Sequence, residues 1–207
     1  MTPTSADAAL GDVSRETVAT LEKYVALLLK WNRRINLVSQ STLKDVWTRH
    51  VQDSLQLYDL APEKTAHWVD LGSGGGFPGL VIAILSREKD PQRRVTLVES
   101  DQRKSTFLRQ VLRETGVKAT VLSERIEVVP PLSATILSAR ALTDLEGLCG
   151  YAHRHLGKDG TALFPKGATW KNELGAARNA WSFSLVEHTS QTDPNAVILQ
   201  IGELANV

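Results

Sequence analysis

The fold is decided by the stretch VDLGSGGGFPG, residues 69–79. An apolar run from His67 to Leu71 predicts a short buried strand, and five of the next eight residues are glycines, which let the backbone turn without a Cβ in the way. Pro78 has a fixed φ that suits the first turn of a helix, and the apolar residues after it predict a helix over 78–86. A strand, a glycine turn and a helix form the first half of a nucleotide-binding βαβ unit.

Two classes of ligand fit this glycine turn. Gly74, Gly76 and Gly79 have the spacing of the dinucleotide-binding fingerprint. A second pattern is the order Asp70, Gly72, Gly74 and Gly76, an acid followed by three alternating glycines. This pattern is usual in methyltransferases that use S-adenosylmethionine (SAM). A dinucleotide brings a pyrophosphate, whereas SAM brings a sulfonium and an ammonium, which a carboxylate near the turn favours. Asp70 therefore favours SAM; the alternative is that its side chain orders the turn through hydrogen bonds to the backbone.

A second signal for an adenosine site follows the next predicted strand, Arg94–Val98. Glu99 comes at the carboxyl end of that strand, about twenty residues past the last glycine, where an acidic side chain can accept hydrogen bonds from both hydroxyls of a ribose. The alternative is a solvated loop carboxylate. We expect the cofactor to contact a set of acids and glycines, namely Asp70, Gly72, Gly74, Gly76 and Glu99.

The rest of the chain alternates between strands and helices. In chain order the patterns predict a helix over 104–115, strands over 118–122 and 134–138, a helix over 144–156, a strand over 161–164, a helix over 170–180, and β-rich runs over 182–187 and 196–201. The last two runs are compatible with an antiparallel hairpin at one sheet edge. The predicted fold class is therefore α/β, with a doubly wound, mostly parallel sheet and an antiparallel C-terminal hairpin.

Two further helices are predicted before the glycine turn. Apolar residues recur with helical spacing over 14–31, and a capping-box pattern at Thr42 opens a second helix to Leu60. Neither helix belongs to the βαβ unit. We therefore expect residues 1–62 to form a helical extension packed on a single domain, residues 63–207, because a chain of 207 residues can bury one sizeable core.

Composition excludes several classes of protein. The single cysteine, Cys149, excludes an intrachain disulfide, and its apolar surroundings favour a packed thiol over a nucleophile. The five histidines have no metal-ligand spacing, so no metal is expected. The N-terminus lacks a signal-peptide pattern, and no apolar stretch is long enough to cross a membrane. We expect a soluble, cytoplasmic monomer.

The net charge of +1 conceals two basic segments. Residues 15–49 hold seven basic and three acidic residues, and residues 87–118 hold nine basic and five acidic ones. Such segments can follow a phosphate backbone, although exposed helix faces rich in Lys and Arg are also ordinary.

Motifs in a fixed order identify a resemblance to a known family. They are Leu29-x-Trp31-Asn32-x-x-x-Asn36-Leu37, Arg49-His50-x-x-Asp53-Ser54-Leu55, the glycine stretch 70–79, Leu97-x-Glu99-Ser100, Lys104-x-x-Phe107-Leu108, Ala139-Arg140-Ala141 and Lys166-Gly167. Together these motifs, spread over residues 18–167, resemble RsmG (also called GidB), the bacterial SAM-dependent methyltransferase that modifies N7 of a guanine in 16S ribosomal RNA. The resemblance implies a class I, Rossmann-like methyltransferase whose partner is 16S rRNA or the small ribosomal subunit.

The resemblance also implies further site residues. The SAM contacts of the family carry over to Gly72, Phe77, Ile126, Glu127 and Arg140, all of which follow predicted strand ends. Guanine N7 carries a lone pair and no proton, so we expect no general base and name no catalytic residue.

Substrate contacts are predicted from charge. Arg140 and Lys166 are expected to hold the base or a phosphate, and Arg33, Arg34, Arg103 and Lys104 to contact the RNA backbone. Family members commonly carry basic residues in and after the last strand, whereas residues 193–201 have none. Three alternatives stay open: a SAM-dependent methyltransferase on another substrate, an NAD-binding oxidoreductase, and a non-catalytic RNA-binding module that has lost the use of its cofactor.

Overall fold

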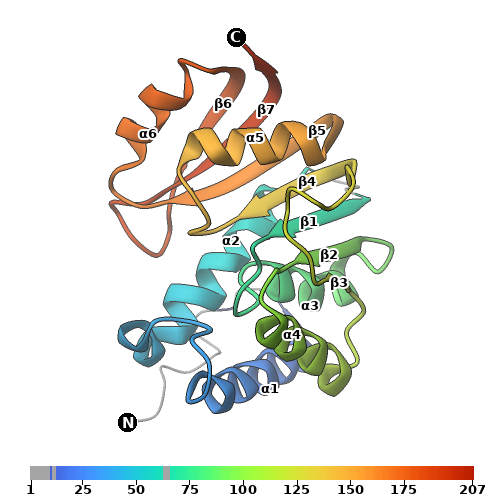
Figure 1. Ribbon diagram of the computed structural model, residues 1–207. Coiled ribbons are helices and arrows are strands. Elements are labelled where there is room, and N and C mark those ends of the chain that lie inside the picture. The colour runs from blue at the N-terminus through green and yellow to red at the C-terminus, as the bar shows by residue number, and fades with distance from the viewer. Residues whose placement is uncertain (1–9, 11–12, 63–65) are drawn as a thin grey trace.

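The computed structural model describes residues 10, 13–62 and 66–207 (Figure 1). Within these residues seven strands form one sheet in the order β3-β2-β1-β4-β5-β7-β6. The strands are β1 (His67–Leu71), β2 (Arg94–Val98), β3 (Thr120–Leu122), β4 (Ala134–Ala139), β5 (Leu156–Lys166), β6 (Trp181–Thr189) and β7 (Val197–Asn206). The first five are parallel, and β7 pairs antiparallel with both β5 and β6. The predicted doubly wound sheet with a C-terminal hairpin is confirmed.

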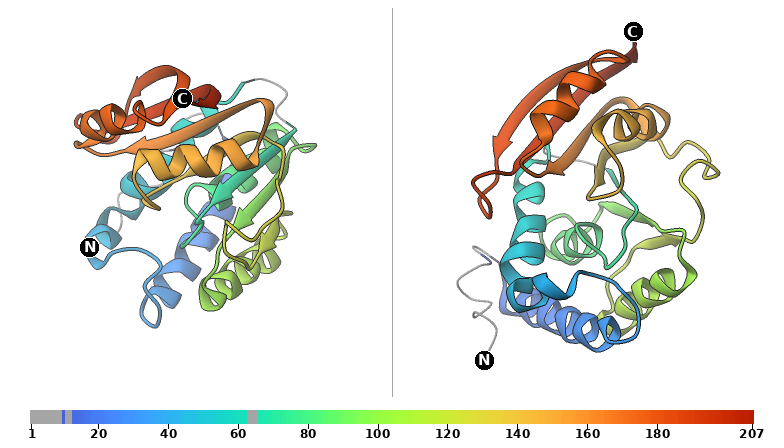
Figure 2. Two further views of the ribbon diagram at one scale, coloured as in Figure 1. Left: turned by 45° about the horizontal axis from the view of Figure 1, so that its top comes forward. Right: turned by 60° about the vertical axis from the view of Figure 1, so that its left-hand side comes forward.

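Helices cover both faces of this sheet (Figure 2). The α-helices are α1 (Arg15–Asn32), α2 (Asp53–Leu60), α3 (Gly79–Lys89), α4 (Gln102–Thr115), α5 (Leu145–His155) and α6 (Trp170–Ala177). One buried cluster lies between the sheet and the first four helices, and a second lies under α5 and α6. Alternate residues of a strand point to opposite faces, which is why Trp68 belongs to the first cluster and Val69 to the second.

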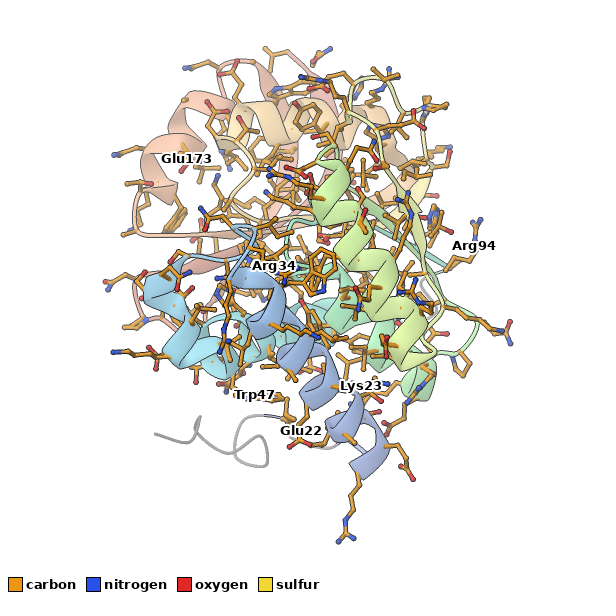
Figure 3. All side chains as sticks on the ribbon, turned by 60° about the horizontal axis from the view of Figure 1, so that its bottom comes forward. Glu22, Lys23, Arg34, Trp47, Arg94 and Glu173 are labelled. Atoms are coloured by element: carbon orange, nitrogen blue, oxygen red, sulfur yellow. The ribbon has the colours of Figure 1, made fainter. Side chains whose placement is uncertain are left out.

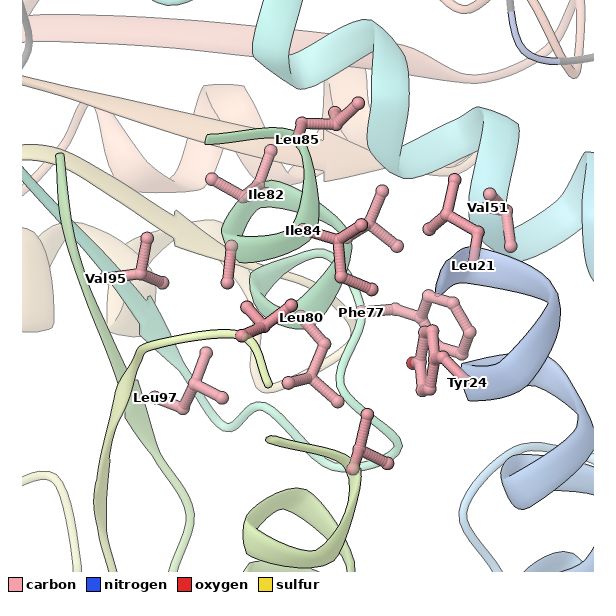
Figure 4. Close-up of a cluster of buried hydrophobic side chains, with 14 of the residues drawn as sticks. Leu21, Tyr24, Val51, Phe77, Leu80, Ile82, Ile84, Leu85, Val95 and Leu97 are labelled. Atoms are coloured by element: carbon pink, nitrogen blue, oxygen red, sulfur yellow. The ribbon is translucent and has the colours of Figure 1, made fainter. Parts of the chain in front are cut away.

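The N-terminal extension shares the first of these clusters. Leu21 and Tyr24 of α1 and Val51 pack with Phe77 and with Leu80 of α3 (Figure 4). Ser14 caps α1, because its side chain accepts a hydrogen bond from the N–H of Thr17. The extension is therefore joined to the glycine turn through a common core.

The prediction of one helix over 42–60 is wrong. The chain forms a 3-10 helix over Gln40–Asp45 and a π-helical turn over Trp47–Gln52 before α2 begins. The hydroxyl of Thr42 caps no N–H; instead it donates to the carbonyl of Ser39 at 2.9 Å. Apolar spacing alone does not distinguish α from π turns, and π turns often occur at functional sites.

The strand order reverses between β1 and β4. Both strands are parallel and adjacent, so their carboxyl ends meet at the same edge of the sheet, with Gly72 following one and Arg140 the other. Ligands of doubly wound sheets bind at this kind of reversal. A ligand site is therefore expected at this edge of the sheet.

Candidate cofactor and substrate site

The glycine turn has the backbone that its sequence predicts. Gly72, Gly74 and Gly76 have φ values of 66°, 53° and 96°, in a region that side chains with a Cβ rarely adopt. The three glycines differ in what they face. A Cβ at Gly76 would collide with Leu80 and the hydroxyl of Tyr24, whereas a Cβ at Gly74 would have a single neighbour within 4 Å, at 3.7 Å. Gly76 is thus packed on the core, and Gly74 borders open space.

Asp70 lies beneath the turn. Its side chain is completely buried, and its two carboxylate oxygens accept hydrogen bonds from the N–H of Gly79 at 3.2 Å and from the hydroxyl of Ser138 at 2.8 Å. Burial raises its pKa to about 6, against the lowering effect of these hydrogen bonds. Direct contact between Asp70 and a cofactor was the expectation; the geometry instead fits the alternative, in which this carboxylate orders the turn.

Glu99 points at the glycine turn. One carboxylate oxygen accepts a hydrogen bond from the N–H of Gly74 at 2.8 Å, and the other accepts one from the N–H of Asp101, also at 2.8 Å. These bonds fix the carboxylate beside the turn, and each oxygen keeps a lone pair for a further donor. An acid held in this way can receive the hydroxyls of a ribose.

A cavity of about 290 Å³ opens next to Glu99. It is bordered by the glycine turn, the ends of β2 and β4, and the loop that follows β3. Its lining consists of Gly72, Gly74, Val98, Glu99, Ser100, Lys104, Glu124, Arg125, Ile126, Glu127, Ala141, Leu142 and Tyr151. The expected residues Gly72, Gly74, Glu99, Ile126 and Glu127 therefore meet in one place.

A larger cavity of about 690 Å³ lies on the other side of the glycine turn. The N-terminal extension, the end of β5 and the turn of the β6–β7 hairpin form its walls. The residues that border both cavities are Gly72, Gly74, Lys104 and Ala141. The two cavities therefore adjoin at the carboxyl edge of the sheet, so that ligands in them would lie side by side.

An aromatic stack forms part of the larger cavity. The imidazole of His50 stacks on Phe77 with ring centroids 5.0 Å apart, and the guanidinium of Arg140 lies 5.3 Å from the centroid of Phe77. Phe77 and Arg140 both border the larger cavity. Neither is among the described residues that line the smaller cavity. Both were expected at the cofactor; they lie instead on the other side of the turn.

The imidazole of His50 is held neutral. Burial, with the charges of Arg140 and Arg49 nearby, lowers its pKa to about 3. Thr42 gives its hydroxyl hydrogen to a carbonyl, so the hydroxyl oxygen accepts a hydrogen bond from His50 Nε2 at 2.8 Å. Ser54 bonds to the backbone carbonyl of His50 and not to its ring. These residues form no nucleophilic triad.

Arg140 is oriented by the extension. Its guanidinium donates to the carbonyl of Arg49 at 3.2 Å and lies 3.5 Å from a carboxylate oxygen of Asp53. Its side chain is one-fifth exposed. A partly buried guanidinium over an aromatic ring presents a planar donor group to the cavity.

The turn of the C-terminal hairpin contacts the extension. Arg49 forms an ion pair with Asp193 at 3.1 Å, and the hydroxyl of Thr192 donates to Asp53 at 2.9 Å. Gln56 accepts a hydrogen bond from the N–H of Gln191 at 3.0 Å. Residues 193–201, which contain no basic residue, thus supply Asp193, and its carboxylate pairs with Arg49 in the wall of the larger cavity.

The expected substrate cations differ in their surroundings. Lys104 borders both cavities. Lys166 borders the larger one; its ammonium forms an ion pair with Glu173 at 2.5 Å, and its side chain is 9% exposed. Its expected contact with the substrate stays a prediction. Arg33, Arg34 and Arg103 are exposed and lie outside both linings; Figure 3 shows Arg34 just past the end of α1.

Three contacts at the site connect distant parts of the sequence and were not predicted. The buried hydroxyl of Tyr24 donates to the carbonyl of Gly75 at 2.6 Å and so ties α1 to the turn. Tyr151 of α5 borders the smaller cavity. Leu142 touches the position where Gly72 would carry a Cβ. In sequence these residues show only as members of apolar faces.

The described residues offer neither a metal site nor a membrane-spanning helix. They contain no group of three or more His, Cys, Asp or Glu side chains arranged to hold a metal ion. None of the described helices is both long and apolar enough to span a bilayer.

Comparisons with known proteins agree with this geometry. The model of the GidB family, described as rRNA small subunit methyltransferase G, matches residues 17–198. A relative from Ruegeria pomeroyi, named ribosomal RNA small subunit methyltransferase G, is 57% identical over 97% of this chain and 98% of its own length. A relative of the same name from a Ruegeria species is 55% identical over 92% of each chain.

A solved structure has a similar fold at low identity. It is a TehB-like SAM-dependent methyltransferase from Corynebacterium glutamicum, which matches with a TM-score of 0.59 and 16% identity over 86% of this chain and 98% of its own. Because the family model covers most of the sequence and the relatives match along nearly their whole length, the chain belongs to the GidB family of rRNA small subunit methyltransferases.

Proposed function

We propose that this protein transfers the methyl group of SAM to N7 of a guanine in 16S ribosomal RNA. The observation that carries the proposal is the pair of adjoining cavities at the sheet reversal: one bordered by the glycine turn and Glu99, the other by Arg140 and Lys104. Membership in the GidB family supports both the cofactor and the rRNA substrate.

The smaller cavity fits the adenosyl part of SAM. Gly74 leaves its backbone open to close approach, Gly72 borders the same cavity with Leu142 packed against it, and Glu99 is held where ribose hydroxyls can reach it. Ile126 offers an apolar side chain for one face of a purine, and Leu142 adds a second apolar side chain to the lining. At about 290 Å³ the space is of the size expected for a small-molecule site.

The chemistry requires alignment more than proton transfer. SAM supplies an electrophilic methyl group on a sulfonium, and guanine N7 supplies an unprotonated lone pair. The residues around the larger cavity therefore need only hold the base in line and support the charge that moves onto it. Neither a metal nor a general base enters this account.

The substrate is RNA, so the larger cavity should bind both a base and phosphates. Arg140 and Lys104 are the cations we propose for these contacts, with Arg33, Arg34 and Arg103 extending the basic surface. We propose that residues 1–62 serve this substrate side and that residues 63–207 form the methyltransferase unit. A partner of this kind would place the enzyme in the cytoplasm.

Nucleoside mass spectrometry tests this function. Small subunits and bare 16S rRNA from cells that lack the gene are incubated with purified protein and SAM. We expect one additional 7-methylguanosine per rRNA with the wild-type protein and none with Glu99→Ala. Methylation at another atom, or of another molecule with 16S rRNA unchanged, would reject the proposal.

The NAD alternative has a simple test of its own. S-adenosylhomocysteine at a hundred times its dissociation constant should stabilise the protein by roughly 2.7 kcal/mol, seen as a raised melting temperature. Stabilisation by NADH, without any by S-adenosylhomocysteine, would favour an oxidoreductase.

A further inference from the structure

Helix α5 holds the loop that follows β3. Three of its side chains reach this loop: the hydroxyl of Tyr151 donates to the carboxylate of Glu127 at 2.5 Å, Arg154 donates to the carbonyl of Val129 at 3.0 Å, and His155 Nε2 bonds to the carbonyl of Ile126 at 3.1 Å. The loop segment they hold, residues 126–129, includes two residues that line the smaller cavity.

The three donors lie on one side of the helix. Residues three and four apart in an α-helix are neighbours, so Tyr151, Arg154 and His155 face the same way. A carbonyl can only accept, so His155 donates through Nε2–H, which fixes its tautomer. Burial lowers the pKa of His155.

The loop has little other support. Residues 124, 125, 127 and 128 are exposed, with Val128 66% exposed, and the described backbone bonds within the segment run from the N–H groups of Val128 and Val129 to the carbonyl of Arg125. The side chains of Ile126 and Val129, in contrast, are buried in the cluster under α5. The position of the loop therefore depends on the helix.

We propose that Tyr151 and His155 are positioning residues that set the affinity for the adenine end of the cofactor by holding Ile126 and Glu127 in the cavity wall. The inference rests on the proposed cofactor site and names residues that act on it from a different element. If the adenine binds beside Ile126 as proposed, the contact acts on the adenine end of the cofactor, and the rate of transfer at saturating SAM should not depend on it.

Tyr151→Phe is the decisive variant, because it removes one hydroxyl at the cavity rim and leaves the ring. We expect the dissociation constant for S-adenosylhomocysteine, measured by calorimetry, to rise about fivefold, as the loss of one hydrogen bond implies. The KM for SAM should rise by the same factor, with kcat at saturating SAM and KM for RNA unchanged. Tyr58→Phe removes a hydroxyl on α2 at a residue that is in the lining of neither cavity, and it should change none of these values.

A second probe tests where on the cofactor the contact acts. Methylthioadenosine contains the base and the ribose without the amino-acid part, so its affinity should fall by the same factor in Tyr151→Phe. His155→Gln keeps an N–H donor and should bind both probes more tightly than His155→Phe does.

The outcomes separate this inference from the proposed site. If Glu99→Ala loses binding while Tyr151→Phe binds both probes as the wild type does, the positioning role is wrong and the site stands. If Glu99→Ala binds S-adenosylhomocysteine normally, the site itself is wrong. A fall in kcat with KM for SAM unchanged would also overturn the positioning role.

Discussion

Replacing Asp70 by Asn should change how stability depends on pH. Burial raises the pKa of this carboxyl from 3.8 to about 6, so the folded protein holds the proton more tightly than the unfolded chain does. The contribution of Asp70 to the free energy of unfolding is therefore largest below pH 4. It decreases as the pH rises toward 6, and above pH 6 it changes little further. A shift of this size corresponds to about 3 kcal/mol, of which about 2 kcal/mol falls between pH 4.5 and 7.5.

Urea unfolding of both proteins across that range measures the effect. Asn does not titrate, so the free energy of unfolding of the wild type minus that of Asp70→Asn should decrease by about 2 kcal/mol from pH 4.5 to 7.5. Any change in hydrogen bonding to Gly79 or Ser138 adds an offset that does not vary with pH. Asp59→Asn, at an exposed position of α2, is the control and should give a flat difference. A flat difference for Asp70→Asn would refute the buried, turn-ordering role.

Three further changes test other contacts of the site. Gly74→Val should abolish binding of S-adenosylhomocysteine in calorimetry, because Val resists a positive φ and fills the open space beside the turn. The control Gly116→Val, at a similar φ at the end of α4, should bind normally. Wild-type affinity in Gly74→Val would show that the turn has only a structural role. Asp193→Ala removes the acidic partner of Arg49, so RNA should bind more tightly in filter assays at low salt, with a steeper dependence of the affinity on salt. Weaker RNA binding would contradict a role for Arg49 at the RNA. Tyr24→Phe leaves a buried carbonyl of the turn without its donor and should lower the free energy of unfolding by about 1–3 kcal/mol; an unchanged urea midpoint would count against this tie.

The part of the fold that the sequence predicts well depends on local pattern. Strand β1, the glycine turn and α3 follow one another within about twenty residues, and their apolar runs and glycines have few alternative structures. Glu99 was found from its place after the second strand, and the structure brings it to the N–H of Gly74. In both cases a short-range signal and the rules of parallel sheets were sufficient.

What the sequence did not show depends on side-chain direction and on distant contacts. The sequence around Asp70 fits both a carboxylate that faces a ligand and one that accepts a hydrogen bond from the N–H of Gly79. Strand geometry alone does not distinguish these two directions of the side chain. The bond from Tyr24 to the turn spans 51 positions, and that from Tyr151 to Glu127 spans 24. Pairs this far apart in the chain produce no regular spacing in the sequence from which the contact could be predicted.

Charge was also an incomplete guide to the substrate side. Lys166 is basic and is the last residue of β5, but its ammonium already forms an ion pair with Glu173 of α6. Phe77 lies in the glycine turn but faces the larger cavity, because Tyr24 and His50 pack on its ring. A residue's partners in the fold, and not its type alone, decide whether it can meet a ligand.

The central claim is that the glycine turn and Glu99 enclose the adenosyl group of the methyl donor. A crystal structure with S-adenosylhomocysteine tests it most directly. The account predicts density for the ribose at the carboxylate of Glu99 and for the adenine beside Ile126, with the sulfur toward the larger cavity. Density for the ligand at any other part of the molecule, or a Glu99 carboxylate turned away from it, would contradict the claim.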